Sequence, residues 1–357
     1  MKSNAAPSTQ VGILTLVLTL LGWSSVPLFL RHFAHLIDFW TSNGWRYGFS
    51  ALVWAPVLIV VMFRRQMPRG LWKAALVPSI ANAAGQVCFT WAHYRIEPGL
   101  LTFGLRSQLL FVAIGAWIMF PTERAIIRRP GYLIGAAVLL AGMSVVMLLA
   151  ENHDAPITAP QSPPSDIATA PDDATSPNAT GLASSHDPSA HVQGVLLAIA
   201  SGVLFACYGL AVRKSMHGVN SVIAFAAICQ YTALVMVALM LVLGNRGGLT
   251  VLDLAGGEFA MLLGSALIGI AIGHVFYYFS IARLGVAITA GVLQLQPFIV
   301  AMASLSLFGE RLTASQWIGG CVAVSGAMMM LAVQWRVSRR APVLEEPIAI
   351  AEGESGS

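Results

Sequence analysis

The chain has 357 residues, of which 57% are hydrophobic and only 10% are charged. Soluble domains carry about a quarter of charged residues, so this composition excludes a soluble globular protein and predicts a protein whose surface faces lipid. The net charge of +4 is modest, and we expect no nucleic-acid partner. The four cysteines lie in apolar runs without a CxxC pair, and we therefore expect no disulfide framework, metal site or cofactor.

Ten apolar segments are long enough to cross a bilayer, which takes about 20 residues of helix. The first five segments are Val11–Leu30, Thr41–Phe63, Leu71–Trp91, Leu100–Phe120 and Gly131–Ala150. After a gap, the second five are Val192–Val212, Ser221–Leu243, Phe259–Ile281, Val286–Phe308 and Ser315–Gln334. We therefore predict an all-α integral membrane protein of ten transmembrane helices, divided into two five-helix units at residues 1–150 and 192–335.

The segments outside the two units have a different composition. Residues 151–191 are rich in Pro, Ser, Ala, Thr and Asp and contain no Lys or Arg, which predicts a disordered linker. Of the 20 Lys and Arg residues, 14 fall on one side of the predicted spans and five, Arg46 among them, fall on the other. Because cytoplasmic loops collect basic residues, we place both termini, including the tail at 336–357, in the cytoplasm and the linker outside.

The sequence repeats itself across the linker. Residues 85–108 align with residues 273–296 and share a Gly, a Val, an Arg, a Leu and a Gln at equivalent positions. In each unit a Glu-Arg pair follows the fourth span, Glu123-Arg124 in the first and Glu310-Arg311 in the second. Because five is an odd number of spans, the second unit must be inverted relative to the first. Inverted repeats are typical of secondary transporters.

These features resemble the EamA-type transporters of the drug/metabolite transporter superfamily. The second unit matches best, in Gly-Val-Ala-Ile-Thr-Ala-Gly-Val-Leu-Gln-Leu-Gln-Pro at 285–297 and Phe-Gly-Glu-Arg-Leu-Thr at 308–313. The first unit departs from the pattern, because Leu109 stands in the place of Pro297 and Arg106 stands where that family is usually uncharged. The resemblance implies ten helices around a central cavity and export or uptake of metabolites, but it does not name the substrate. We expect an exporter in a bacterial inner membrane.

The charges inside the predicted spans are unusual. None of the 16 Asp and Glu residues lies mid-membrane, so nothing can act as the embedded carboxylate that small multidrug resistance proteins use for cationic drugs. Arg106 lies roughly 10 Å below the outer end of the fourth span, where a charge costs about 2.5–3.5 kcal/mol on insertion scales. It could hold a carboxylate or phosphate, or it could snorkel to headgroups near Glu97. This asymmetry favours an anionic or zwitterionic solute.

Polar and aromatic residues supply the other candidates. Ser79, Asn82, Gln86, Thr90 and His93 share one face of the third span, which could line a cavity or only bond neighbouring helices. His274 could titrate near neutral pH and couple transport to protons, or it could simply be hydrogen-bonded. The full set of expected cavity-lining residues is Arg106, Asn82, Gln86, Thr90, Trp91, Gln108, Tyr208, His274, Tyr277, Tyr278 and Gln296. We interpret Glu123-Arg124 and Glu310-Arg311 as structural motifs, with a gate contact as the alternative.

The sequence therefore predicts a secondary active transporter of a small metabolite rather than an enzyme. A membrane enzyme would need a catalytic cluster, yet the chain has no HExxH, no GxSxG and no paired intramembrane carboxylates. An ATP-driven pump would need GxxxxGK[ST], which is also missing from the chain. Efflux of lipophilic or cationic drugs stays open, as does a non-transporting receptor or scaffold. The expected partners are the solute and the bilayer, and monomer and homodimer both stay open.

Overall fold

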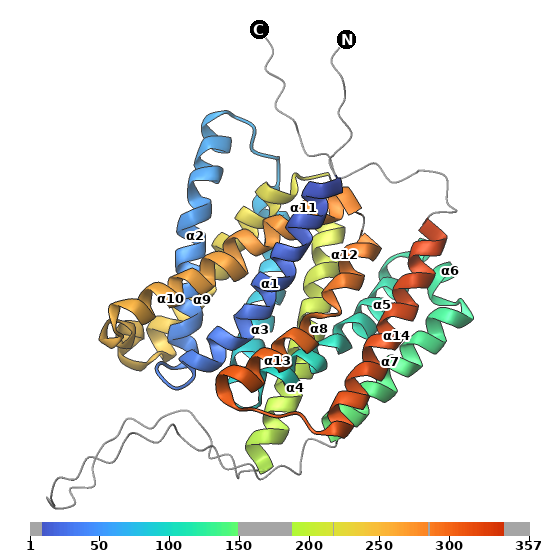
Figure 1. The fold of residues 1–357 in the computed structure, drawn as a ribbon. Helices are drawn as coiled ribbons and strands as arrows, with labels where there is room; N and C mark the ends of the chain where they lie inside the picture. Colours follow the sequence, from blue (N-terminus) through green and yellow to red (C-terminus); the bar gives the residue numbers. More distant parts are fainter. Residues whose placement is uncertain (1–8, 149–187, 217, 285, 339–357) are drawn as a thin grey trace, which may run out of the picture.

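The computed structural model describes residues 9–148, 188–216, 218–284 and 286–338. Their regular secondary structure is entirely helical (Figure 1). Most of the linker predicted at 151–191 and of the tail predicted at 336–357 lies outside these residues. The first helix after the linker already begins at Pro188, a few residues before the predicted start of the sixth span.

The first half contains four long helical stretches and one broken one. Its helices are α1 (Thr9–Phe33), α2 (Phe39–Phe63), α3 (Leu71–His93), α4 (Pro98–Gly104), the short turn η1 (Leu105–Ser107), α5 (Gln108–Met119), η2 (Pro121–Glu123), α6 (Arg124–Ile127) and α7 (Pro130–Leu148). Local chemistry sets several of these boundaries. The Asp38 carboxylate accepts from the Thr41 backbone N–H at 2.9 Å and caps α2, and Pro98 opens α4 where no helical N–H is needed.

The second half follows the same plan with a second broken stretch. Its helices are α8 (Pro188–Ser215), α9 (Ser221–Leu243), η4 (Asn245–Asp253), α10 (Gly256–Ala266), the π-helical turn η5 (Leu267–Ile272), α11 (Gly273–Leu284), α12 (Val286–Leu293), α13 (Gln296–Phe308) and α14 (Ala314–Ser338). Gly309 ends α13 with a left-handed φ of 71°, a conformation that glycine adopts without strain.

Eight helical stretches among the described residues are long and apolar enough to cross a membrane. They are Thr9–Phe33, Phe39–Phe63, Pro98–Met119, Ser189–Ser215, Ser221–Leu243, Gly256–Ile281, Thr289–Phe308 and Ala314–Val337. The predicted third span is not among them because its polar face lowers its mean hydropathy, and α7 contributes a shorter apolar stretch, Pro130–Val146. The prediction of an all-α membrane protein is confirmed, whereas ten spans in inverted repeats remain a prediction.

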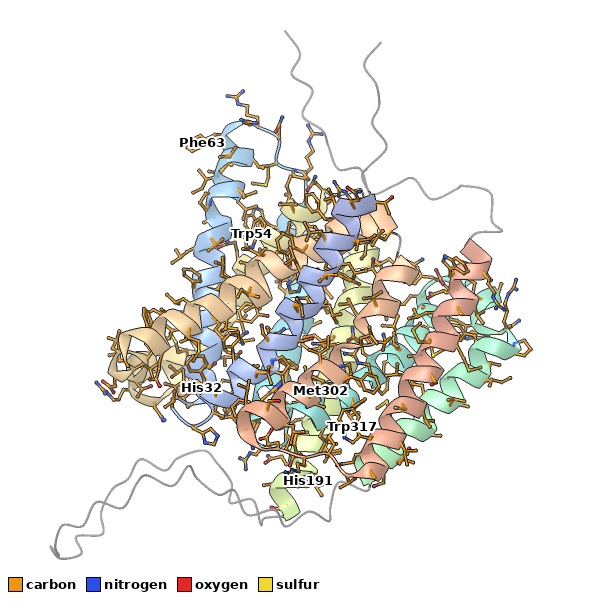
Figure 2. The ribbon with its side chains drawn as sticks, viewed as in Figure 1. His32, Trp54, Phe63, His191, Met302 and Trp317 are labelled. Carbon is orange, nitrogen blue, oxygen red and sulfur yellow. The ribbon has the colours of Figure 1, made fainter. Side chains whose placement is uncertain are left out.

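The outer surface of the bundle is apolar, as a lipid-facing surface must be. Leu52 on α2 and Val242 on α9 are 72% and 79% exposed. Phe63 at the end of α2 and Met302 on α13, both labelled in Figure 2, are also largely exposed. In water such a surface would be strongly unfavourable, so these side chains fit a bilayer environment.

Helices of the two halves pack against each other rather than forming separate bodies (Figure 1). α7 lies along α14, α2 along α9, α3 along α8, and α1 along α11. Glycines permit the closest of these approaches, because a Cβ at Gly142 would lie 2.3 Å from the backbone nitrogen of Ala323. A Cβ at Gly326 would likewise lie 2.3 Å from the backbone nitrogen of Leu139. Small residues at such contacts are a common way to pack helices in membranes.

Candidate functional site

Two helical stretches are interrupted at equivalent positions of the repeat. The turn η1 separates α4 from α5, and a turn at residues 294–295 separates α12 from α13. In the repeat alignment Arg106 in the first break corresponds to Gln294 in the second. Pro297 lies in the first turn of α13, where its missing N–H is not needed. The backbone keeps right-handed helical dihedrals at Gly104, Leu105, Ser107, Gln108 and Leu295, so each break is a tightened turn within a longer helical stretch.

Arg106 connects the two breaks. Its Nη2 donates to Gln296 Oε1 at 2.9 Å, and its Nη1 donates to Gln294 Oε1 and to the Leu293 carbonyl, both at 3.4 Å. Its Nε donates to the Thr102 carbonyl at 3.2 Å. All four acceptors are neutral oxygens. The guanidinium is therefore hydrogen-bonded, but none of these contacts cancels its charge.

Gln296 extends this arrangement to α1. Its Nε2 donates to the Trp23 carbonyl at 2.9 Å while its Oε1 accepts from Arg106. The Trp23 ring lies 5.0 Å from the Tyr277 ring and 5.3 Å from the His274 ring. We refer to Trp23, Arg106, His274, Tyr277, Gln294 and Gln296 as the central cluster. It combines one positive charge, two amides and several aromatic rings, contributed by α1, α11, α13 and the two breaks.

His274 is held in one orientation. Its ring stacks on Phe225 of α9 at 4.5 Å and 15°, and its Nδ1 lies 3.1 Å from the Ile270 carbonyl. A carbonyl can only accept, so Nδ1 carries a proton and Nε2 is the acceptor of the neutral ring. The π-helical turn η5 ends directly before α11, and such turns are frequent at functional sites. Gly273 is required here because a Cβ would lie 2.6 Å from Trp23 Nε1.

The polar face of α3 bonds neighbouring helices. The Asn82 amide donates to Thr232 on α9 at 3.1 Å, and the Thr90 hydroxyl donates to Asn43 on α2 at 2.8 Å. The Asn43 amide in turn donates to the Gln86 backbone carbonyl at 3.4 Å. Trp91, at the end of α3, stacks on Phe39 with ring centroids 5.2 Å apart. These contacts join helices and do not include the central cluster.

The remaining predicted residues lie at the first break and on α8 and α11. Gln108 begins α5 at the first break. The Tyr278 ring lies 5.9 Å from the Tyr277 ring, and Tyr278 also packs against an apolar group around Tyr47. Tyr208 on α8 packs against an apolar group on α3 and α9, and its side chain is hydrogen-bonded to that of Tyr278. Sequence reasoning therefore named residues that the fold brings together and residues that it separates.

A groove opens beside the cluster. It has a volume of about 430 Å³ and lies between α12 and α14. Its lining is apolar apart from Gln294, one of the acceptors of Arg106, and it includes Trp335 near the end of α14. The second break is thus reached by an apolar surface depression.

Each Glu-Arg motif makes an ion pair across the two halves. Glu310 accepts from Arg31 at the end of α1 at 2.7 Å, and its other oxygen accepts from the Ser304 hydroxyl. Glu123 accepts from Arg213 near the end of α8 at 2.6 Å. In both cases the glutamate pairs with the last turns of the first helix of the opposite half. Arg124, the sequence neighbour of Glu123, donates instead to the Trp117 carbonyl at 2.8 Å.

Sequence reasoning missed a second arginine inside the bundle. Arg46 was counted with the loop residues, but it lies inside α2 and is only 1% exposed. Its Nε donates to the Ser265 hydroxyl on α10 at 3.1 Å. The sequence could have shown this, because Arg46 falls within the predicted span Thr41–Phe63.

A comparison with models of known protein families gives a match in the second half of the chain. Residues 192–332 match the model of the EamA-like transporter family. This match confirms the resemblance read from the sequence and covers α8 to α14, with the second break and Glu310. The EamA-like family is one of transporters, so the match points away from an enzyme.

The fold of almost the whole chain also has a counterpart. A solved structure described only as "Crystal structure of protein" is similar with a TM-score of 0.55 and 17% sequence identity. The similarity covers 93% of this chain and 99% of that chain. At such low identity the likeness shows a shared fold alone. The search of curated proteins gave no match.

Proposed function

We propose that this chain is a secondary active transporter that exports a small anionic or zwitterionic metabolite across the inner membrane of a bacterium. The family match supports transport as the general activity. The observation that carries the finer proposal is the meeting of two broken helices at Arg106. In secondary transporters, solutes bind where discontinuous helices of two repeats meet near the midplane.

Reciprocal contacts support ten spans in two inverted repeats. The third predicted span of each half packs on the first span of the other, as α3 on α8 and as α11 on α1. The second and fifth spans pack on their own counterparts, as α2 on α9 and as α7 on α14. The two ion pairs between the halves are also reciprocal, because each glutamate pairs with an arginine near the end of the first helix of the other half. A two-fold relation between the halves accounts for all of these pairings.

The chemistry of the central cluster favours an anionic group on the solute. The guanidinium of Arg106 contributes positive charge, and no carboxylate of the described residues pairs with it. A solute carboxylate or phosphate would replace the amide oxygens of Gln294 and Gln296 as acceptor. The rings of Trp23 and Tyr277 would then contact the apolar part of the solute.

His274 is our candidate for the coupling proton. It contacts Trp23 of the cluster, and in its neutral form the ring has one nitrogen available to accept a proton. Protonation would add a second positive charge beside the solute site. Binding of the solute and of the proton would therefore be linked.

The proposal is tested by flux in reconstituted vesicles. We expect the purified chain to carry a subset of a metabolite panel, with carboxylate or phosphate compounds enriched among those carried. In the same assay, His274→Gln should flatten the dependence of flux on pH. Transport limited to lipophilic cations would overturn the anionic assignment, and no flux of any solute would overturn the transporter. An unchanged pH profile in His274→Gln would remove only the proton role.

A further inference from the structure

Arg46 has almost no hydrogen-bonding partners. Its side chain is fully buried, and among the described residues its one hydrogen bond runs from Nε to the Ser265 hydroxyl. The Ser265 hydroxyl donates its own proton to the Leu262 carbonyl at 2.7 Å. The two terminal nitrogens of Arg46 therefore present four N–H groups without a protein acceptor.

No described carboxylate compensates this charge. Asp38, the acidic residue on the same helix, lies two turns away, or about 12 Å along the axis. Its oxygens already accept from the backbone and hydroxyl of Thr41 and from the backbone N–H of Asn245. A buried arginine without a partner is strongly unfavourable, especially inside a membrane. An anion that is not part of these residues is the natural compensation.

The surroundings of the guanidinium limit the size of such an anion. The backbone of Gly269 in η5 passes so close that a Cβ there would lie 3.7 Å from Arg46 Nη2. The same Cβ would lie 2.2 Å from a methyl carbon of Val26 on α1. The glycine allows α1 and η5 to close around the charge. This close packing beside the guanidinium favours a small anion over a whole metabolite.

We propose that Arg46 binds a small monovalent anion at a site distinct from the central cluster. The partner of Arg46 lies on α10, whereas those of Arg106 lie on α4, α12, the second break and α13, and the two sets share no residue. The terminal nitrogens of Arg46 supply the fork that a halide or a carboxylate accepts from. The ion comes either from the salt of the medium or from a carboxylate of a solute. The proposal does not depend on the identity of the transported metabolite.

The test is thermal unfolding of the full-length protein in detergent. Chloride or formate replaces a bulky sulfonate at constant ionic strength, so that only anion size and type change. A ligand that binds the folded state raises Tm, and the stabilisation grows with the logarithm of ligand concentration above Kd. We expect a rise of more than about 3 °C for wild type and for Arg106→Gln, and no rise for Arg46→Gln.

The result also identifies the source of the anion. A rise with chloride alone assigns an inorganic ion, and a rise with formate alone assigns a carboxylate group. Arg46→Lys keeps the charge but lacks the fork, so it should respond more weakly and serves if Arg46→Gln does not fold. The exposed Arg246→Gln is the matched control and should respond like wild type. Equal Tm values in all salts for wild type, or a full response in Arg46→Lys and Arg46→Gln, would overturn the site.

Discussion

Arg106 and Arg46 lie at similar depths, about 12 Å and 10 Å from the starts of α4 and α2, yet their surroundings differ. Arg106 faces an interrupted helix, whose turn leaves the Leu293 carbonyl and two glutamine side chains available as acceptors. Arg46 lies beside the end of α10 and the π-helical turn η5, and its hydrogen-bond acceptor there is one serine hydroxyl. The second break therefore offers Arg106 several neutral acceptors, whereas Arg46 has one.

Removing the acceptors should destabilise the two arginines unequally. Gln296→Leu removes the 2.9 Å acceptor of Arg106 and also leaves the Trp23 carbonyl without its donor, so we expect a loss of about 2–4 kcal/mol. Ser265→Ala removes a single neutral acceptor of Arg46 and should cost about 1 kcal/mol. Denaturant unfolding in mixed micelles compares the two variants. Equal losses would show that the contrast between the arginines has no energetic consequence.

Breaking the ion pairs of Arg31 and Arg213 should destabilise the protein less than removing the acceptor of Arg106. The side chains of Arg31 and Glu310 are 12% and 13% exposed, whereas Arg213, the partner of Glu123, is 47% exposed. Glu310→Gln leaves a mostly buried Arg31 without its counter-charge and should cost about 2 kcal/mol. Glu123→Gln should cost less than about 1 kcal/mol, because water solvates Arg213. The two variants are matched, and a larger loss for Glu123→Gln would contradict this account.

The helical membrane fold could be predicted from the sequence because long apolar runs have few alternatives to spanning a bilayer as helices. It also indicated Arg106 and Gln296, which meet at the two breaks, and His274 and Tyr277, which lie on α11 and contact Trp23. It could not show that Asn82 and Thr90 bond α9 and α2, because periodicity gives a face but not the helix opposite it. Arg46 was missed because the count of basic residues treated a position near a helix end as a loop.

The central claim is that Arg106 recognises a negative charge on the solute. It is tested most directly by comparing flux of a transported carboxylic acid with flux of its neutral amide, in vesicles containing wild type, Arg106→Lys or Arg106→Gln. We predict that wild type prefers the acid by at least about tenfold, which corresponds to about 1.4 kcal/mol. Arg106→Lys should keep part of this preference and Arg106→Gln should lose it, with similar amounts of folded protein. An unchanged preference in Arg106→Gln would contradict the account.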